Sequence, residues 1–212
     1  MELLLALDFV TLSEAKEILR EVGDGIDIVE MGTPFVIQEG IQVIREIKKE
    51  FPALKVSADL KIMDAGDHES RMAFEVGADI VTVLGVAHNA TIIASVEQAK
   101  KFGASIMIDM IGVADIESRT REIDGLGIHY ICVHTAFDIQ GAGKNSLEEL
   151  QKVKKIVRHG KTAVAGGITL GTIAAIVRER PDIIIVGGGI TGQTDKRQAT
   201  LAMKTAMGGY PQ

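Results

Sequence analysis

The sequence predicts an α/β protein that folds as a single (β/α)8 barrel, or TIM barrel, over residues 1–212. Short apolar runs alternate with amphipathic segments, and successive runs start about 20 to 30 residues apart, the length of one βα unit. The runs contain few polar residues, as expected of a parallel sheet that is covered by helices. We expect eight strands, at residues 3–7, 26–29, 54–58, 80–84, 105–108, 130–133, 162–165 and 183–186.

The segments between these runs carry the signals of helix ends. Residues 11–20 begin at Thr11 or Ser13, either of which can cap a helix. Glu14 lies early and Arg20 late in this segment, an order that complements the helix dipole. The other predicted helices cover residues 40–51, 67–76, 91–102, 115–123, 146–157, 170–180 and 194–207.

Two glycine-rich turns favour a closed barrel over an open, doubly wound sheet. The open sheet would favour a G-x-G-x-x-G turn after the first strand, but that strand leads into Asp8-Phe9-Val10. Glycines instead follow the seventh and eighth runs, as Gly166-Gly167 and Gly187-Gly188-Gly189. Phosphate sites after the last two strands are typical of barrels, so we expect an active site at the C-terminal ends of the strands.

Composition indicates a cytoplasmic protein without nucleic-acid or membrane partners. The chain has 212 residues, 46% of them apolar, a net charge of −6 and no block of Lys or Arg. Its single cysteine, Cys132, excludes an intrachain disulfide framework and suits a reducing compartment. The first apolar run lacks a basic flank and does not resemble a signal peptide. We find no apolar run near the roughly 20 residues that span a bilayer.

Ionisable residues gather at the predicted C-terminal ends of the strands. Any one of them could be a helix cap or a loop residue, but a set at the same end of separate strands indicates one pocket. Buried charges need partners or a metal to offset their desolvation. The candidates are Asp8, Glu30, Asp59, Lys61, Asp109 and His134.

The types of these residues suggest their chemistry. Glu30 and Asp59 offer the hard oxygen ligands that Mg²⁺ prefers. Lys61 could stabilise an oxyanion, and His134 could move a proton near neutral pH. Asp59 and Lys61 are two residues apart, so in an extended strand they share a face. The role of Asp109 stays open.

The glycine turns predict a phosphate site. Without Cβ atoms, the backbone at Gly166, Gly167, Gly187 and Gly188 can approach a phosphate closely and present N–H groups to it. Helices predicted to start near Thr169 and Thr194 could face the same anion. Either turn alone could be purely structural, but two turns after neighbouring strands favour phosphate binding.

Several motifs resemble those of one known family. They are Asp59-x-Lys61-x-x-Asp64-Ala65-Gly66, Leu5-Ala6-Leu7-Asp8, Val29-Glu30-Met31-Gly32-Thr33-Pro34 and Cys132-Val133-His134-Thr135. The first resembles the D-x-K-x-x-D motif of the orotidine-phosphate decarboxylase superfamily. Over essentially the whole chain, the sequence is most similar to the 3-hexulose-6-phosphate synthase family, whose sister is 3-keto-L-gulonate-6-phosphate decarboxylase. Orotidine-phosphate decarboxylase itself is less similar, because Glu30 and His134 occupy positions of the metal-dependent branch.

Two departures favour the synthase over its sister. The decarboxylases carry an Arg three residues after the sixth-strand His, where this chain has Phe137. They usually carry a second, phosphate-contacting Arg after the first glycine of the eighth-strand turn, where this chain has Gly188. Backbone amides would then do more of the phosphate binding.

The resemblance implies an aldehyde-lyase. It would condense formaldehyde with D-ribulose 5-phosphate to D-arabino-hex-3-ulose 6-phosphate, and catalyse the reverse, through an ene-diolate. The alternatives are decarboxylation of 3-keto-L-gulonate 6-phosphate and a non-catalytic sugar-phosphate-binding barrel. The resemblance implies Mg²⁺, with Mn²⁺ as the alternative ion, on Glu30 and Asp59.

The resemblance also assigns the remaining roles. Lys61 would donate to the oxyanion and His134 would shuttle the proton, while Asp8 would orient Lys61 or a substrate hydroxyl. Asp64 would enter the active site of the partner subunit in a homodimer.

Overall fold

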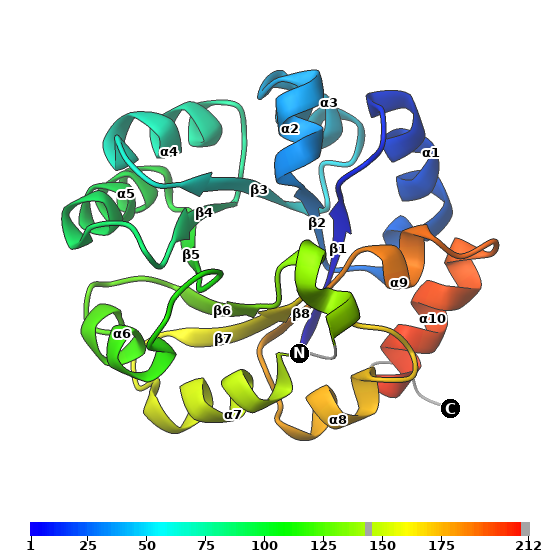
Figure 1. The fold of residues 1–212 in the computed structure, drawn as a ribbon. Coiled ribbons are helices and arrows are strands. Elements are labelled where there is room, and N and C mark those ends of the chain that lie inside the picture. Colours follow the sequence, from blue (N-terminus) through cyan, green and yellow to red (C-terminus); the bar gives the residue numbers. More distant parts are fainter. Residues whose placement is uncertain (143–145, 209–212) are drawn as a thin grey trace.

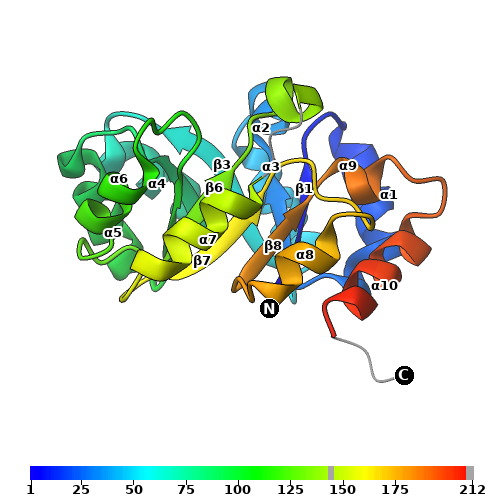
Figure 2. The same cartoon turned by 60° about the horizontal axis from the view of Figure 1, so that its bottom comes forward.

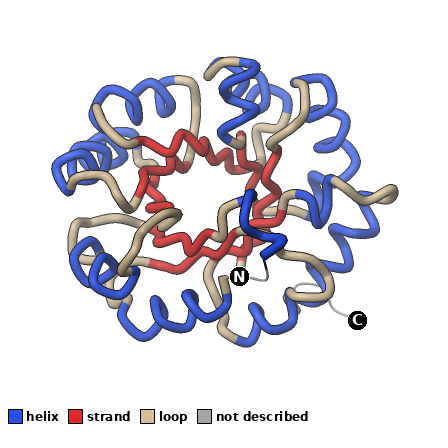
Figure 3. The backbone as a smooth tube through the Cα atoms, in the orientation of Figure 1, coloured by secondary structure: helices blue, strands red, loops and turns tan. Residues whose placement is uncertain are grey.

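A computed structural model describes residues 1–142 and 146–208. Its eight parallel strands follow one another around a closed barrel, and the last pairs with the first, which confirms the predicted fold (Figures 1 and 3). The strands are β1 (Glu2–Leu7), β2 (Ile28–Met31), β3 (Lys55–Ile62), β4 (Ile80–Leu84), β5 (Ser105–Asp109), β6 (Tyr130–His134), β7 (Lys161–Ala165) and β8 (Ile183–Val186).

Helices surround the ring of strands, as Figure 3 shows. They are α1 (Leu12–Val22), α2 (Thr33–Glu39), α3 (Gln42–Glu50), α4 (Gly66–Glu75), α5 (Asn89–Phe102), α6 (Ile116–Ile123), α7 (Leu147–Ile156), α8 (Ile173–Arg178), α9 (Gly188–Thr191) and α10 (Lys196–Ala206). Two 3₁₀ helices add η1 (Gly23–Gly25) and η2 (Phe137–Ala142). Thr11 caps α1 in a capping box with Glu14, which confirms the first predicted helix start.

The short helices α2 and α9 are absent from the sequence-based prediction. Pro34 in the first turn of α2 is a helix-start signal, but neither helix has a side-chain N-cap, and α9 spans only four residues. The start expected near Thr169 lies too early, whereas the start expected near Thr194 is confirmed to within two residues. The structure begins α8 at Ile173, and Asp195 caps α10 by accepting from the backbone N–H of Gln198 at 2.7 Å.

Two apolar layers hold the barrel together. Alternate strand residues point outward and pack under the helices, as Leu3, Leu5 and Leu7 of β1 do. The intervening residues fill the barrel interior, where Leu4 lies with Met107 and other buried side chains. Cys132 also belongs to this interior, and burial raises the pKa of its thiol well above the usual value, so it is a core residue.

The N-terminal end of the barrel repeats one hydrogen-bonding unit four times. The residue just before each even-numbered strand donates its backbone N–H to the carbonyl of a residue on the preceding strand. Its side chain accepts a hydrogen bond from the backbone N–H of that strand residue. The pairs are Asp27 with Leu3, Asp79 with Val56, His129 with Ile106 and Asp182 with Thr162, with side-chain distances of 2.7, 2.7, 3.1 and 2.8 Å. These pairs fix neighbouring strands in register below the core.

The opposite end of the barrel is covered in part by η2. Figure 2 shows this light green helix above the strands, on the side away from the N-terminus. The C-terminal ends of all strands therefore open toward η2. Within residues 1–142 and 146–208, we find no helix of the length and apolarity that a bilayer crossing requires.

Candidate active site

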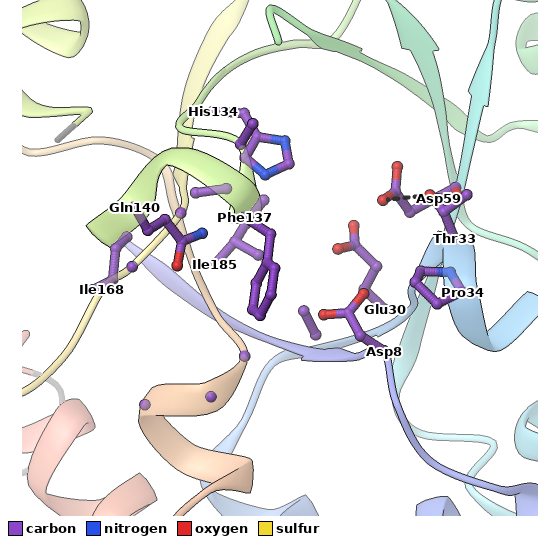
Figure 4. A pocket seen from close by; sticks show the side chains of 18 of the residues that line it. Asp8, Glu30, Thr33, Pro34, Asp59, His134, Phe137, Gln140, Ile168 and Ile185 are labelled. Atoms are coloured by element: carbon purple, nitrogen blue, oxygen red, sulfur yellow. Dashed lines mark hydrogen bonds between the residues drawn. The ribbon is translucent and has the colours of Figure 1, made fainter. Parts of the chain in front are cut away.

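A cavity of about 670 Å³ lies at the C-terminal ends of the strands. Every strand or the turn after it contributes to its lining. The predicted site residues in the lining are Asp8, Glu30, Asp59, Lys61, Asp109, His134, Gly166, Gly167, Gly187 and Gly188. Figure 4 shows Asp8 and Glu30 pointing into the cavity, with Asp59 above them and His134 across from them. The structure thus brings together residues that are far apart in the sequence.

Lys61 reaches this cavity through an irregularity in β3. Ala58 pairs with Val81 of β4 and Ile62 pairs with Val83, so three residues of β3 face one residue of β4. Lys61 adopts a left-handed backbone with a φ of 48°, which costs about 1–2 kcal/mol for a residue with a Cβ. Such bulges redirect side chains next to active sites. Asp59 and Lys61 do lie together, but β3 is not regularly extended between them.

The Lys61 ammonium bridges two carboxylates from different strands. Its Nζ lies 2.7 Å from Asp59 Oδ2 and 2.9 Å from Asp109 Oδ2. Burial alone would lower the pKa of Lys61, but the two carboxylates hold that pKa above its usual value. Lys61 is therefore a fixed positive charge across the working pH range.

Asp109 joins Lys61 to His134. The same Asp109 Oδ2 lies 2.9 Å from Nδ1 of His134, and Oδ1 accepts from the backbone N–H of Ile111 at 2.9 Å. Burial would raise the pKa of Asp109, but the bond to His134 and the charges of His134 and Lys61 lower it to about 2. An ionised Asp109 favours the His134 tautomer with hydrogen on Nδ1, which leaves Nε2 free to accept a proton.

Asp59 is held by hydroxyl groups from helix α2 and strand β4. Thr33, at the start of α2, donates to Asp59 Oδ2 at 3.0 Å and to its backbone carbonyl at 2.7 Å. Thr82 of β4 donates to Asp59 Oδ1 at 2.7 Å. Together with Lys61, these donors orient a carboxylate that is only 8% exposed.

Glu30 and Asp8 complete an acidic wall beside Asp59. Burial and the charge of Asp59 raise the pKa of Glu30 well above its usual value, and the same two causes raise the pKa of Asp8. Ser57 donates to Glu30 at 3.1 Å. Gly32 lets the Asp8 side chain approach, because a Cβ at Gly32 would clash with the Asp8 carboxylate.

This acidic wall suits a divalent cation. Among the lining residues that the structure describes, Lys61 is the lone Lys or Arg facing several carboxylates. A cation beside Glu30 and Asp59 would offset the repulsion that raises the pKa of Glu30. No group of three or more His, Cys, Asp or Glu side chains forms a ready metal cage within the described part of the chain. Mg²⁺ needs no such cage, since it keeps several waters and takes one or two carboxylates.

The glycine turns form the other end of the cavity. Gly166 and Gly167 have positive φ angles of 97° and 67°, and a Cβ on Gly166 would clash with the backbone carbonyl of Thr135. A Cβ on Gly188 would meet nothing within 4 Å, so its open side faces space that an anion could fill. Thr169 lines the cavity as well, whereas Thr194 does not.

Two exposed aromatic rings mark the mouth of the cavity. Phe9, after β1, and Phe137, in η2, make an edge-on contact with ring centroids 5.7 Å apart. They remain 72% and 70% exposed and both line the cavity. Phe137 stands beside the acidic wall in Figure 4. The pair spans from β1 to β6, which are not neighbouring strands.

Asp64 does not line the cavity of its own chain. It lies two residues after β3, it is exposed, and its Oδ1 accepts from the backbone N–H of Ala65 at 2.8 Å. Ala65 has a left-handed φ of 49°, which turns the chain sharply into α4. Asp64 is the one predicted site residue that the structure leaves apart from the others.

Sequence reasoning missed the threonines around Asp59. Nothing in the spacing of Thr33 or Thr82 marks them, because their partners lie 26 and 23 residues away. A signal for Thr82 does exist, as it is a polar residue inside the apolar run 80–84. The unresolved role of Asp109 is answered by its contacts with Lys61 and His134.

The fold and site define a barrel enzyme in which a lysine–carboxylate–histidine cluster shares one cavity with two glycine turns. Residues 1–203 match the model of the Orotidine 5'-phosphate decarboxylase / HUMPS family, and the chain belongs to this family. It is 56% identical to the 3-hexulose-6-phosphate synthase of Bacillus subtilis (strain 168), over 96% of this chain and 97% of that protein. It is 49% identical to 3-hexulose-6-phosphate synthase 2 of Staphylococcus saprophyticus, over 94% of this chain and 93% of that protein.

Solved structures agree with this placement. The crystal structure of 3-hexulose-6-phosphate synthase from Salmonella typhimurium superposes with a TM-score of 0.97 at 40% identity, over 99% of this chain and all of that one. The 3-keto-L-gulonate-6-phosphate decarboxylase of Vibrio cholerae superposes with a TM-score of 0.85 at 26% identity, over 99% of both chains. The chain is an enzyme, and the relatives of highest identity named above are of the aldehyde-lyase type.

Proposed function

We propose that this enzyme condenses formaldehyde with D-ribulose 5-phosphate to form D-arabino-hex-3-ulose 6-phosphate, and that it catalyses the reverse cleavage. The observation that carries the proposal is the cavity with two unlike ends: a lysine–carboxylate–histidine cluster and a glycine-lined turn pair. The 56% identity to a protein named for this reaction supports it.

The two ends of the cavity orient the sugar phosphate. Backbone N–H groups at Gly166, Gly167, Gly187 and Gly188 bind the phosphate, since glycine lets it approach closely. The carbonyl and C1 hydroxymethyl groups then lie toward Lys61 and His134. Positioning of this kind supplies a large share of the catalytic effect.

The chain's own residues carry the proton and the charge. His134 Nε2 takes a proton from C1, and the electron pair moves through the C1–C2 bond onto the C2 oxygen, next to the Lys61 ammonium. C1 of the ene-diolate then bonds to the formaldehyde carbon, whose oxygen takes the proton back from His134. Asp109 holds His134 in the required tautomer.

Glu30 and Asp59 are the residues that would hold Mg²⁺, with Mn²⁺ as a substitute. When bound, the ion supplies positive charge to the sugar oxygens that become negative during proton removal. The charge of Asp8 contributes to the raised pKa of Glu30, and Asp8 orients Lys61 or a substrate hydroxyl.

Asp64 serves the second subunit of a homodimer. It does not line its own cavity, and exposed apolar side chains lie on the elements around it: Met63 after β3, Met72 on α4, Val86 after β4 and Ile93 on α5. Exposed apolar side chains on neighbouring elements are typical of a protein interface. A two-fold axis there would bring Asp64 toward the partner's cavity.

Mixed dimers test the role of Asp64. Lys61→Ala and Asp64→Ala subunits should each be inactive alone, yet a mixture should regain about one quarter of wild-type activity, since half of the dimers then carry one intact site. If no activity returns in verified heterodimers, Asp64 does not act across the interface.

Solvent exchange tests the chemistry. In D₂O without formaldehyde, we expect the enzyme to place deuterium at C1 of ribulose 5-phosphate, because proton removal precedes carbon–carbon bond formation. A non-catalytic binding barrel would bind the sugar phosphate without exchange. CO₂ release from 3-keto-L-gulonate 6-phosphate at a rate above that of condensation would assign the enzyme to the decarboxylase activity instead.

A further inference from the structure

We infer that Thr82 is a positioning residue that holds both Asp59 and Lys61 in their working geometry. The inference rests on the proposed function, because it assigns Thr82 a role through these two residues. Thr82 lies in the middle of β4, is 3% exposed and lines the cavity. It is the residue that faces the irregular stretch of β3.

The irregularity in β3 leaves the backbone N–H of Lys61 in need of a hydrogen-bond acceptor, which Thr82 provides. Between the pairs Ala58–Val81 and Ile62–Val83, β3 has three residues and β4 has one. The ladder therefore offers no regular partner to the backbone N–H of Lys61. That N–H donates instead to the Thr82 hydroxyl at 3.0 Å. A buried N–H without a partner would cost about 1–3 kcal/mol.

The direction of hydrogen bonding at Thr82 is determined. Its oxygen accepts the Lys61 N–H, so its single proton is free for Asp59 Oδ1, which lies 2.7 Å away. Asp59 and Lys61 are thus linked twice: directly through Nζ and Oδ2, and indirectly through Thr82. The indirect link connects the carboxylate to the strained backbone of Lys61, whose φ is 48°.

A hydroxyl at this position therefore stabilises the left-handed backbone conformation of Lys61. Without it, the Lys61 N–H would seek another acceptor and the backbone would relax toward a regular strand. A regular register would shift the lysine side chain relative to Asp109. The phosphate end of the cavity, built from the turns after β7 and β8, would stay unchanged.

The test compares Thr82→Val, which keeps the shape, with Thr82→Ser, which keeps the hydroxyl. Thr120→Val is a matched control, because the Thr120 hydroxyl is also buried but finds no hydrogen-bond partner among the described residues. We expect Thr82→Val to lower kcat about 100-fold, the effect of a small misplacement of a catalytic group. KM for the sugar phosphate should change little, and Thr82→Ser and Thr120→Val should stay close to wild type.

Hydrogen exchange gives a readout that does not depend on activity. The Lys61 amide should be protected in the wild type and in Thr82→Ser but exchange much faster in Thr82→Val, while amides of β7 stay protected. If Thr82→Val fails to fold, Thr82→Ala replaces it, with the same expected loss relative to Thr82→Ser.

Three results would overturn the inference: wild-type kcat in Thr82→Val, equal losses in Thr82→Ser and Thr82→Val, or unchanged protection of Lys61. A wild-type enzyme that condenses no formaldehyde would refute the proposed function instead, and the exchange data would still decide whether Thr82 positions Lys61.

Discussion

His134 and Asp109 end the neighbouring strands β6 and β5, and Nδ1 of His134 lies 2.9 Å from Oδ2 of Asp109. The same oxygen lies 2.9 Å from Lys61 Nζ. One carboxylate therefore sets the orientation of both His134, the proposed proton carrier, and Lys61, the proposed stabiliser of the oxyanion. This contact makes Asp109 a positioning residue.

Replacing Asp109 by Asn should separate the effect of its charge on His134 and Lys61 from the effect of its size on packing. Asn keeps the size but removes the charge that holds the tautomer of His134 and pairs with Lys61. We expect kcat to fall about 10- to 100-fold, the usual effect of losing such a supporting contact. The steady-state kcat and the rate of deuterium exchange at C1 should fall together. A wild-type exchange rate in Asp109→Asn would contradict this role.

Because the pKa of Asp109 is low, its protonation affects activity and stability only in acid. A carboxyl whose folded-state pKa is about 2 contributes stability above its unfolded value of about 3.9, and loses it as pH falls through the folded value. Asp109 thus stays ionised above about pH 4. Protonation of Asp109 therefore does not contribute to a loss of activity between pH 5 and 7.

Glu30→Gln should stabilise the protein while abolishing its activity. Burial and Asp59 raise the pKa of Glu30, so the folded state loses stability as pH rises above the unfolded pKa of about 4.3. Gln carries no charge and escapes this penalty. Without divalent cations, Tm of the variant should exceed that of the wild type by about 2–4 °C at pH 8, and the difference should shrink near pH 5. A lower Tm at pH 8 would contradict the electrostatic account.

His129→Asp should make the protein less sensitive to acid. His129 takes the place that Asp27, Asp79 and Asp182 hold in the other repeats, and its Nδ1 must be unprotonated to accept from Ile106. Burial and the charge of Lys161 lower the pKa of His129. Its stabilising contribution is therefore complete above the unfolded pKa of about 6.5, and is lost as pH falls toward the folded value.

Thermal melts between pH 7.5 and 5 measure this effect. The wild type should lose about 2–4 °C more than His129→Asp over this range, and the exposed His159, replaced by Gln, is the control. Parallel Tm curves for the wild type and His129→Asp would refute the role of the His129 contact.

Gly188→Ala should weaken substrate binding without harming the fold. A Cβ at Gly188 meets nothing within 4 Å, so the methyl group fits the free protein but fills space at the anion site. We expect KM for ribulose 5-phosphate to rise about 10-fold, a loss of about 1.4 kcal/mol. Gly125→Ala is the matched control, because it too meets nothing within 4 Å and does not line the cavity. Equal KM values for the two variants would place the phosphate elsewhere.

The barrel and most of its site could be predicted from sequence because they depend on local patterns. Apolar runs at regular spacing mark the strands, and in a barrel every strand end opens into one cavity. Asp8, Glu30 and His134 therefore fall in the lining simply by their place after an apolar run.

The finer geometry depends on contacts that no local pattern reveals. Lys61 meets Asp59 through a left-handed residue in an irregular strand, although a regular strand also predicts that the two share a face. Thr82 takes its role from a register shift between two strands. The repeat at the N-terminal end is hidden because a histidine fills one of its four positions.

Formaldehyde consumption tests the central claim most directly. Purified enzyme is given formaldehyde and D-ribulose 5-phosphate, with Mg²⁺ or with EDTA, and Lys61→Ala serves as the inactive control. We predict that formaldehyde disappears in equal amount with ribulose 5-phosphate, only when the sugar phosphate and Mg²⁺ are both present, as hexulose phosphate accumulates. Undiminished consumption after exhaustive EDTA treatment would remove the metal from the account, and a folded wild-type enzyme that consumes no formaldehyde would contradict the proposed function.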